Sequence, residues 1–340
     1  MELFFGQPVT LSGSDAGSYV LQDKVLDDVP GPDLVRMSTA NTAYRSVVAA
    51  YVGRKFDLDT LLSRFFNGVE LSMLYLLQKH LGVVISGSVA LQFFDRSTFE
   101  GSDLDLYVMK ENSDALECWL QTIGYTIVEK PAYVGTSITG VTTFGRYRSG
   151  VQVISTRNTV VETILEFSLT CVMNLITYFE AICIYPRATF VKREALLLNS
   201  NLSLNGTTFI DKYRSRGWTI ICTLDPLQQF DTDSDFYCPP DSRRTRAIGD
   251  DRCWVIPLRD MTSPPTSDLK FVNTWRLTYR DSPYMSFTIL RHDRLLHSYV
   301  ITLDPDVVRH IYDVLDEQHR DLAVQRSLRL HFHTQNMESR

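Results

Sequence analysis

The carboxylates of Asp103 and Asp105 are the side chains in this chain best suited to chemistry. They stand two residues apart in SDLDLYVM, whose alternating apolar residues predict a β-strand. Because side chains alternate along a strand, both carboxylates should project from one face, roughly 7 Å apart, while Leu104 and Leu106 point into a core. Two carboxylates on one face can share a divalent cation, and Mg²⁺ combines such ligands with phosphate oxygens.

A glycine-serine turn precedes these aspartates. Gly87 and Ser88 lie between the apolar run VVIS, predicted to be a strand, and SVALQFFDR, predicted to be a helix. Gly87 lets the backbone approach a phosphate closely. Ser88, at the start of the helix, can hold phosphate oxygens through its amide and hydroxyl with help from the helix dipole. Turn and aspartates together predict a site for magnesium and a nucleoside triphosphate.

This strand, Gly-Ser turn, helix and Asp-x-Asp strand resemble the signature of the nucleotidyltransferase superfamily. The resemblance covers residues 83–108 closely and about 80–180 through the order of strands. It implies a mixed sheet flanked by helices, Asp103 and Asp105 as catalytic magnesium ligands, and Gly87 and Ser88 at the phosphates. It also implies transfer of a nucleotidyl group from the triphosphate to an acceptor.

Gln152 departs from that signature. The resemblance implies a third carboxylate on a later strand, which helps to deprotonate the acceptor, and the alternation of VQVI places Gln152 there. A glutamine cannot act as a base and holds a second magnesium poorly, but its amide can orient a water or a ribose hydroxyl of the nucleotide. This departure puts catalysis in doubt more than the fold or nucleotide binding, and leaves both an active and a degenerate member open.

Four other features could join the site. Glu162 and Glu166 could replace the missing carboxylate, but both fit better in the helix predicted to follow. Arg96 could contact a triphosphate, although we favour a role at the end of its helix. The fragment KYRSRGW, residues 212–218, suits a phosphate or base, and equally suits a surface helix end that leads into a buried tryptophan.

The remaining patterns predict an α/β or α+β fold in four parts. These are a polar tail at 1–30, a helical segment at 31–80, the nucleotidyltransferase-like core at 81–200, and a β-rich C-terminal region with a final helix at 201–340. In the core we expect a helix capped by Ser113 and stopped by Gly124, strands in TIVEK, VTTFGRYR and VQVIST, and helical periodicity through VVETILEFSLTCVMNLITYF. In the C-terminal region we expect a hairpin around residues 291–294 and a helix beginning at Pro305.

Composition limits the functional classes. The chain has 340 residues, of which 44% are hydrophobic and 22% charged, as in globular proteins, and its net charge of −6 does not favour a nucleic-acid partner. The six cysteines lack zinc spacing, so we expect reduced, packed thiols. Three alternating aspartates at 231, 233 and 235 lack the glycine and glutamate of a calcium loop, and we expect them in a solvated loop. Without a signal peptide or an apolar run of bilayer length, we expect no membrane partner and a cytoplasmic or nuclear location.

Three functions remain open. One is an active nucleotidyltransferase, and another is a non-catalytic relative that binds a nucleotide or a protein partner, which Gln152 favours. The third is an interaction protein, because PDLVRMSTANTAYRSVVAAYV resembles the second half of an F-box. We prefer to interpret these helices as a packing layer for the core.

Overall fold

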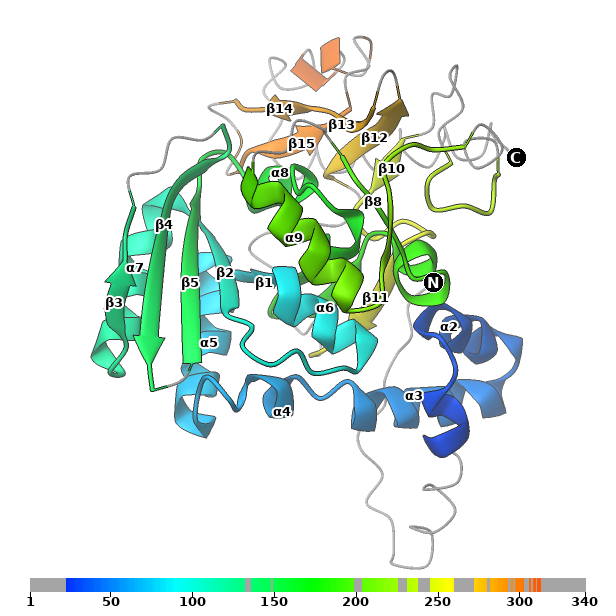
Figure 1. Cartoon of the computed structure of the whole chain (residues 1–340), viewed down its shortest axis with the longest axis horizontal. Coiled ribbons are helices and arrows are strands. Elements are labelled where there is room, and N and C mark those ends of the chain that lie inside the picture. Colours follow the sequence, from blue (N-terminus) through cyan, green and yellow to red (C-terminus); the bar gives the residue numbers. More distant parts are fainter. Residues whose placement is uncertain are drawn as a thin grey trace, which may run out of the picture.

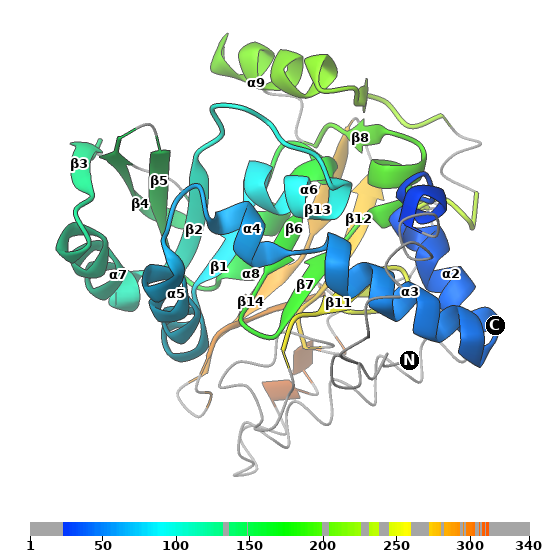
Figure 2. The same cartoon turned by 90° about the horizontal axis from the view of Figure 1, so that it is seen from below.

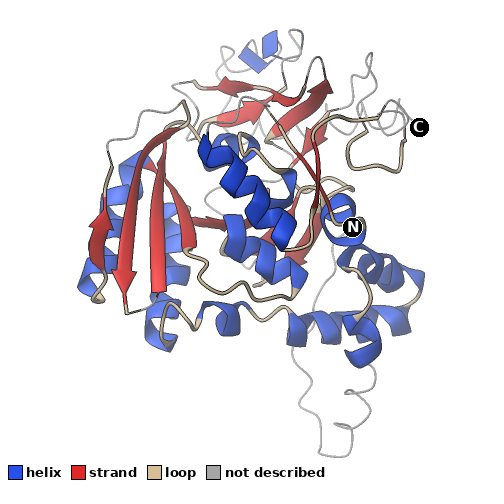
Figure 3. Ribbon diagram, in the orientation of Figure 1, coloured by secondary structure: helices blue, strands red, loops and turns tan. Residues whose placement is uncertain are grey.

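The computed structural model combines helices and strands in one molecule (Figures 1 and 3). The described residues are 23–131, 136–147, 149–198, 204–225, 231–237, 245–259, 272–279, 282–292, 295, 297–302, 306, 308–309 and 311–312.

A mixed sheet of eight strands forms the centre, in the order β11-β7-β6-β1-β2-β5-β4-β3. Within it β2 and β5 are parallel and the other neighbouring pairs are antiparallel. The strands are β1 Val84–Ser86, β2 Leu104–Met109, β3 Thr126–Glu129, β4 Ile138–Arg146, β5 Ser149–Thr156, β6 Asn174–Ile176, β7 Glu180–Cys183 and β11 Trp254–Pro257. The expected mixed sheet with helices is confirmed. Its edge strand β11 comes from beyond residue 200, where we expected the core to end.

Helices lie on both sides of the strands that carry the aspartates (Figures 1 and 2). Helices α5 (Gly68–Leu81) and α7 (Lys110–Thr122) lie behind β2 and β5 in Figure 1, and α9 (Leu204–Ser215) lies in front. Leu104 and Leu106 of β2 are fully buried in the core that includes α7, as expected. By alternation, Asp105 between them faces the side of the sheet on which α9 lies.

The N-terminal helices pack on the core. They are α2 Gly31–Ala40, α3 Thr42–Lys55 and α4 Leu58–Leu62. Leu34 and Tyr51 are fully buried, and a Cβ atom on Gly31 would overlap the ring of Trp254 in β11. The guanidinium of Arg96, at the end of α6 (Gly87–Asp95), donates to the carbonyls of residues 26 and 29. This side chain thus ties the core to the N-terminal helices.

The helix predicted through residues 160–179 is wrong beyond its first turns. Helix α8 ends at Leu165, and a 3₁₀ turn (η1, Thr170–Val172) leads into β6 and β7. Asn174 donates to the carbonyl of Cys171, which stabilises the turn. Residues 169–176 are all buried, and an apolar run of this kind has no polar face from which periodicity can distinguish helix from strand.

Two smaller predictions also needed adjustment. Helix α7 begins at Lys110, so Ser113 lies inside the first turn, where its hydroxyl donates to the carbonyl of Lys110. Asp235 is buried instead of solvated: it accepts from the amide of Ala188 at 2.8 Å, at the start of the π-helix Arg187–Val191 (η2). Gly124 is in the left-handed region just after α7, as a helix stop requires.

A second core lies between the sheet and the C-terminal strands. Its elements are α8 Val160–Leu165, β10 Arg246–Ala247, β12 Thr274–Tyr279, β13 Pro283–Ser286, β14 Thr288–Leu290 and β15 Tyr299–Ile301. Strands β14 and β15 pair antiparallel, which confirms the expected hairpin. The short strands β8 (Glu194–Leu196) and β9 (Thr219–Ile221) pair parallel beside α9. The final helix is described only at residues 306, 308–309 and 311–312, so its expected start at Pro305 lies outside the described residues.

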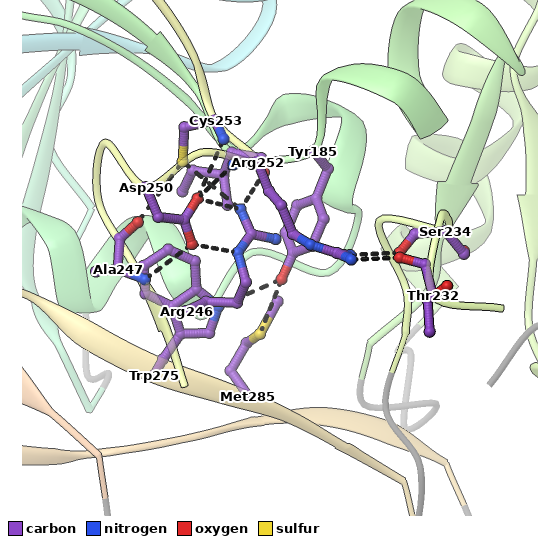
Figure 4. A network of polar contacts seen from close by, with 11 residues as sticks. Tyr185, Thr232, Ser234, Arg246, Ala247, Asp250, Arg252, Cys253, Trp275 and Met285 are labelled. Atoms are coloured by element: carbon purple, nitrogen blue, oxygen red, sulfur yellow. Dashed lines mark hydrogen bonds and ion pairs between the residues drawn. The ribbon is translucent and has the colours of Figure 1, made fainter. Parts of the chain in front are cut away.

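A buried ion pair organises this second core (Figure 4). Arg246 donates to both carboxylate oxygens of Asp250, at 2.6 and 3.1 Å, and to the carbonyl of Ile184 at 2.9 Å. Its guanidinium lies 5.4 Å from the ring centroid of Tyr185 and 5.6 Å from that of Trp275. A buried charge is tolerated when it is paired and hydrogen-bonded in this way.

Two further findings concern membranes and cysteines. Across the described helices, none has the length and apolar character needed to cross a membrane. The five described cysteines are free thiols, two of them (Cys171 and Cys183) fully buried and one (Cys253) partly buried.

Candidate functional site

Strand register brings the predicted site residues together where β1 meets α6 and β2 begins. Asp105 of β2 is the register partner of Ser86, the last residue of β1, and of Gln152 in β5. Gly87 follows directly as the first residue of α6. Asp103 lies one residue before the start of β2. The sequence motif therefore folds into one compact corner of the sheet.

Asp105 lies directly over Gly87. Gly87 has a φ of +67°, in the left-handed region that favours glycine. A Cβ atom there would lie 2.3 Å from Oδ2 of Asp105. Gly87 is thus required by the conformation of the turn and by its contact with the carboxylate of Asp105. The sequence had predicted that its backbone would contact a phosphate.

Asp103 has a second glycine beneath it. A Cβ atom on Gly150, the second residue of β5, would lie 2.0 Å from Oδ1 of Asp103. The exposed carboxylate of Asp103 therefore lies against the start of β5, the strand that carries Gln152. Nothing in the sequence around Gly150 indicates this role, because the contact depends on the parallel pairing of β2 with β5.

Neither carboxylate has an ion-pair or hydrogen-bond partner among the described residues. Burial and the neighbouring Asp103 together raise the pKa of Asp105 to about 7, although Lys212 acts in the opposite direction. Nearby anions and desolvation both disfavour a charged carboxylate, and a bound cation would reverse that balance. The pair fits a divalent cation in its oxygen chemistry and in its lack of protein partners.

Gln152 lies beside Asp105 in the sheet. It is the register partner of Asp105 on one side and of Thr143 in β4 on the other. Gln152 and Thr143 are partly exposed on the face that carries the aspartates. Within the described part of the chain, no group of three or more His, Cys, Asp or Glu side chains is arranged to hold a metal. A cation here would be held by two carboxylates, water and ligand oxygens.

The C-terminal end of α9 closes over the turn. The hydroxyl of Tyr213 lies 3.1 Å from the hydroxyl of the buried Ser88. Arg216 donates to Ser88 at 3.4 Å and to Ser102 at 3.1 Å, and its guanidinium stacks 4.2 Å from the ring centroid of Phe99. Helix α9 is therefore fastened to both ends of the motif.

Lys212 belongs to the same end of α9. Burial and the nearby Arg216 lower the pKa of Lys212, whereas Asp105 and Asp103 raise it, so its ammonium interacts with both carboxylates. Lys212 also borders an open hollow along α9, lined by Thr208, Phe209, Asp211, Lys212 and Ser215. Lys212 therefore connects the aspartates with a hollow that a partly exposed aromatic ring, Phe209, also lines.

The fragment 212–218 fits both interpretations offered for it. Trp218 is 2% exposed and donates to the carbonyl of Thr189, as a buried anchor would. Lys212 and Arg216 face the motif. Sequence reasoning noted these cations but could not connect them with the aspartates about 110 residues earlier, and it missed Tyr213 as the partner of Ser88.

Other candidates are engaged elsewhere. Glu162 lies in α8, where both its oxygens accept from Asn158. Glu166 accepts from the hydroxyls of Thr136 and Ser137. Neither carboxylate is therefore free to join the aspartates.

Comparison of the chain with protein-family models, with curated proteins and with solved structures found no match. Any function must therefore be argued from the site itself.

Proposed function

We propose that this protein binds a magnesium–nucleoside triphosphate at the corner formed by β1, β2 and α6, on a nucleotidyltransferase-like core. Asp103 and Asp105 would ligate the magnesium through their carboxylates. Gly87 shapes the turn, and Ser88, Lys212 and Arg216 would surround the phosphates.

The observation that carries the proposal is that two carboxylates, which form no hydrogen bond or ion pair with the described residues, lie near two cations at the C-terminal end of α9. Carboxylates that form no direct ion pair favour a metal, whereas Lys212 and Arg216 favour an anion beside it. A magnesium-bound triphosphate satisfies both groups at once, because the metal bridges carboxylate and phosphate oxygens. Neither a metal alone nor a phosphate alone matches both sides of this site.

The hollow along α9 suits the nucleoside. Phe209 lines it, and its ring lies 5.0 Å from that of Tyr213, between their centroids. Bases stack on aromatic rings with little dependence on their identity. A triphosphate held at Lys212 and Arg216 could therefore extend its base toward Phe209.

Transfer of the nucleotidyl group is a second candidate function. Binding at this site would place a phosphate chain against Asp103, whose exposed carboxylate leans toward Gln152. Gln152 can orient an acceptor hydroxyl but cannot remove its proton. Because such transfers depend mainly on positioning and charge neutralisation, slow turnover is compatible with this arrangement.

The F-box resemblance does not enter the proposal. Apolar residues of α2 and α3, including Leu34, Val48 and Tyr51, are buried in the core of this chain. They are therefore not available to dock an adaptor.

Isothermal titration calorimetry with the four magnesium–nucleoside triphosphates tests the proposal. We expect the wild type to bind at least one of them, and the double variant Asp103→Ala, Asp105→Ala to lose that binding. The double variant Asp231→Ala, Asp233→Ala removes two exposed aspartates from a loop and serves as the control. Equal binding by all three proteins would place the nucleotide elsewhere, and no binding by the wild type would refute the proposal.

A further inference from the structure

The nucleotidyltransferase resemblance implies three carboxylates for a site that holds two cations, and this site has two. Gln152 lies beside Asp105 in the sheet, and Thr143 lies beyond Gln152. Both side chains are neutral, and Glu162 and Glu166 are bonded elsewhere. A second divalent cation at this edge would meet an amide and a hydroxyl, which are weak ligands without a compensating negative charge.

Lys212 supplies a positive charge at the same place. Hydrogen bonds hold its helix there: one joins the hydroxyls of Tyr213 and Ser88, and two run from Arg216 to Ser88 and Ser102. The ammonium of Lys212 interacts electrostatically with both aspartates, but among the described residues it forms no direct ion pair with either.

We propose that this site takes one divalent cation with its nucleotide, and that the ammonium of Lys212 supplies the charge a second cation would bring. An aspartate together with a divalent cation has a net charge of plus one. A glutamine together with an ammonium has the same net charge. The inference rests on the proposed function and specifies its metal requirement.

Electron paramagnetic resonance of Mn²⁺ counts the bound cations directly, since Mn²⁺ takes the same oxygen ligands as Mg²⁺. The α,β-methylene analogues of ATP, GTP, CTP and UTP are added in turn, so that no transfer occurs. The proteins compared are the wild type, Gln152→Asp, and the double variant Gln152→Asp, Lys212→Met. Gln152→Asn controls for the shortened side chain, and Lys110→Met, at the opposite end of β2, controls for loss of a lysine.

We expect one Mn²⁺ per chain in the wild type and both controls, and two in Gln152→Asp. In the double variant the second Mn²⁺ should bind roughly tenfold more tightly than in Gln152→Asp, because the ammonium no longer repels it. Two Mn²⁺ ions in the wild type, or a second-site affinity that is unchanged by Lys212→Met, would overturn the inference while leaving the proposed function intact. No Mn²⁺ with any analogue would refute the proposed function itself.

Discussion

At the scale of single residues, the site depends on two glycines as much as on two aspartates. Gly87 leaves room for the carboxylate of Asp105, and Gly150 leaves room for that of Asp103. Gly87 was predictable, because a turn between a strand and a helix requires it. Gly150 was not, because its partner is 47 residues away and only the register of β2 with β5 brings them together.

The substitution Gly150→Ala should displace the carboxylate of Asp103 without disrupting the fold, since that side chain is exposed and can rotate. We expect Mn²⁺ affinity to fall about tenfold, while the free energy of unfolding changes by less than about 1 kcal/mol. Titration calorimetry and urea unfolding measure the two quantities. Gly140→Ala in β4 is the matched control, because a Cβ atom there meets nothing nearer than 4.0 Å. Unchanged Mn²⁺ affinity in Gly150→Ala would show that Gly150 does not position Asp103.

Asp105 should make the stability of the metal-free protein depend on pH. Its pKa of about 7 in the folded protein lies above the ordinary value of 3.8, so between these values the folded state holds more protons than the unfolded state. The free energy of unfolding therefore falls as pH rises through this window.

Asp105→Asn removes that dependence. At pH 8 we expect this variant to be more stable than the wild type by about 1 to 3 kcal/mol, and near pH 4 to be equally stable. Urea unfolding in EDTA measures both, with the exposed Asp233→Asn as control. A variant less stable than the wild type at pH 8 would mean that the charged carboxylate is stabilised by the fold.

At the scale of elements, local patterns predicted most strands and helices, and failed where burial is complete. Alternation identified β2, β4 and β5 because one side of each is more polar. Residues 160–183 are buried on nearly every side, so β6 and β7 gave no periodic signal. Helix α9 illustrates a different limit: its cations were visible in the sequence, but their position over the Gly-Ser turn follows from tertiary packing.

The buried pair of Arg246 and Asp250 gives an element-scale prediction for the second core. Arg246→Met leaves the carboxylate of Asp250 without its main partner in a buried position. We expect a loss of about 3 to 5 kcal/mol in the free energy of unfolding. Arg36→Met, in the exposed pair with Asp33, should cost less than about 1 kcal/mol. Similar losses in the two variants would show that burial does not increase the contribution of Arg246 to the free energy of unfolding.

At the scale of the whole molecule, the net charge does not predict the charges that surround the site. The chain is acidic overall, with a net charge of −6. Lys212 of α9 nevertheless interacts with both aspartates, and Arg216, just after this helix, donates to Ser102 beside Asp103. Strands β1 to β5, the Gly-Ser turn and the place of Gln152 beside Asp105 followed from the sequence, whereas β6, β7, the closure by α9 and the contribution of β11 to the sheet required the fold.

The most direct test of the central claim is calorimetric titration of the wild-type protein with each nucleoside triphosphate, in magnesium and again in EDTA. The account predicts saturable binding of at least one triphosphate to one site per chain in magnesium, weakened at least tenfold in EDTA because the carboxylates then repel the phosphates. Binding of equal strength in both buffers would contradict a metal held by Asp103 and Asp105. No binding in either buffer would contradict the nucleotide site as a whole.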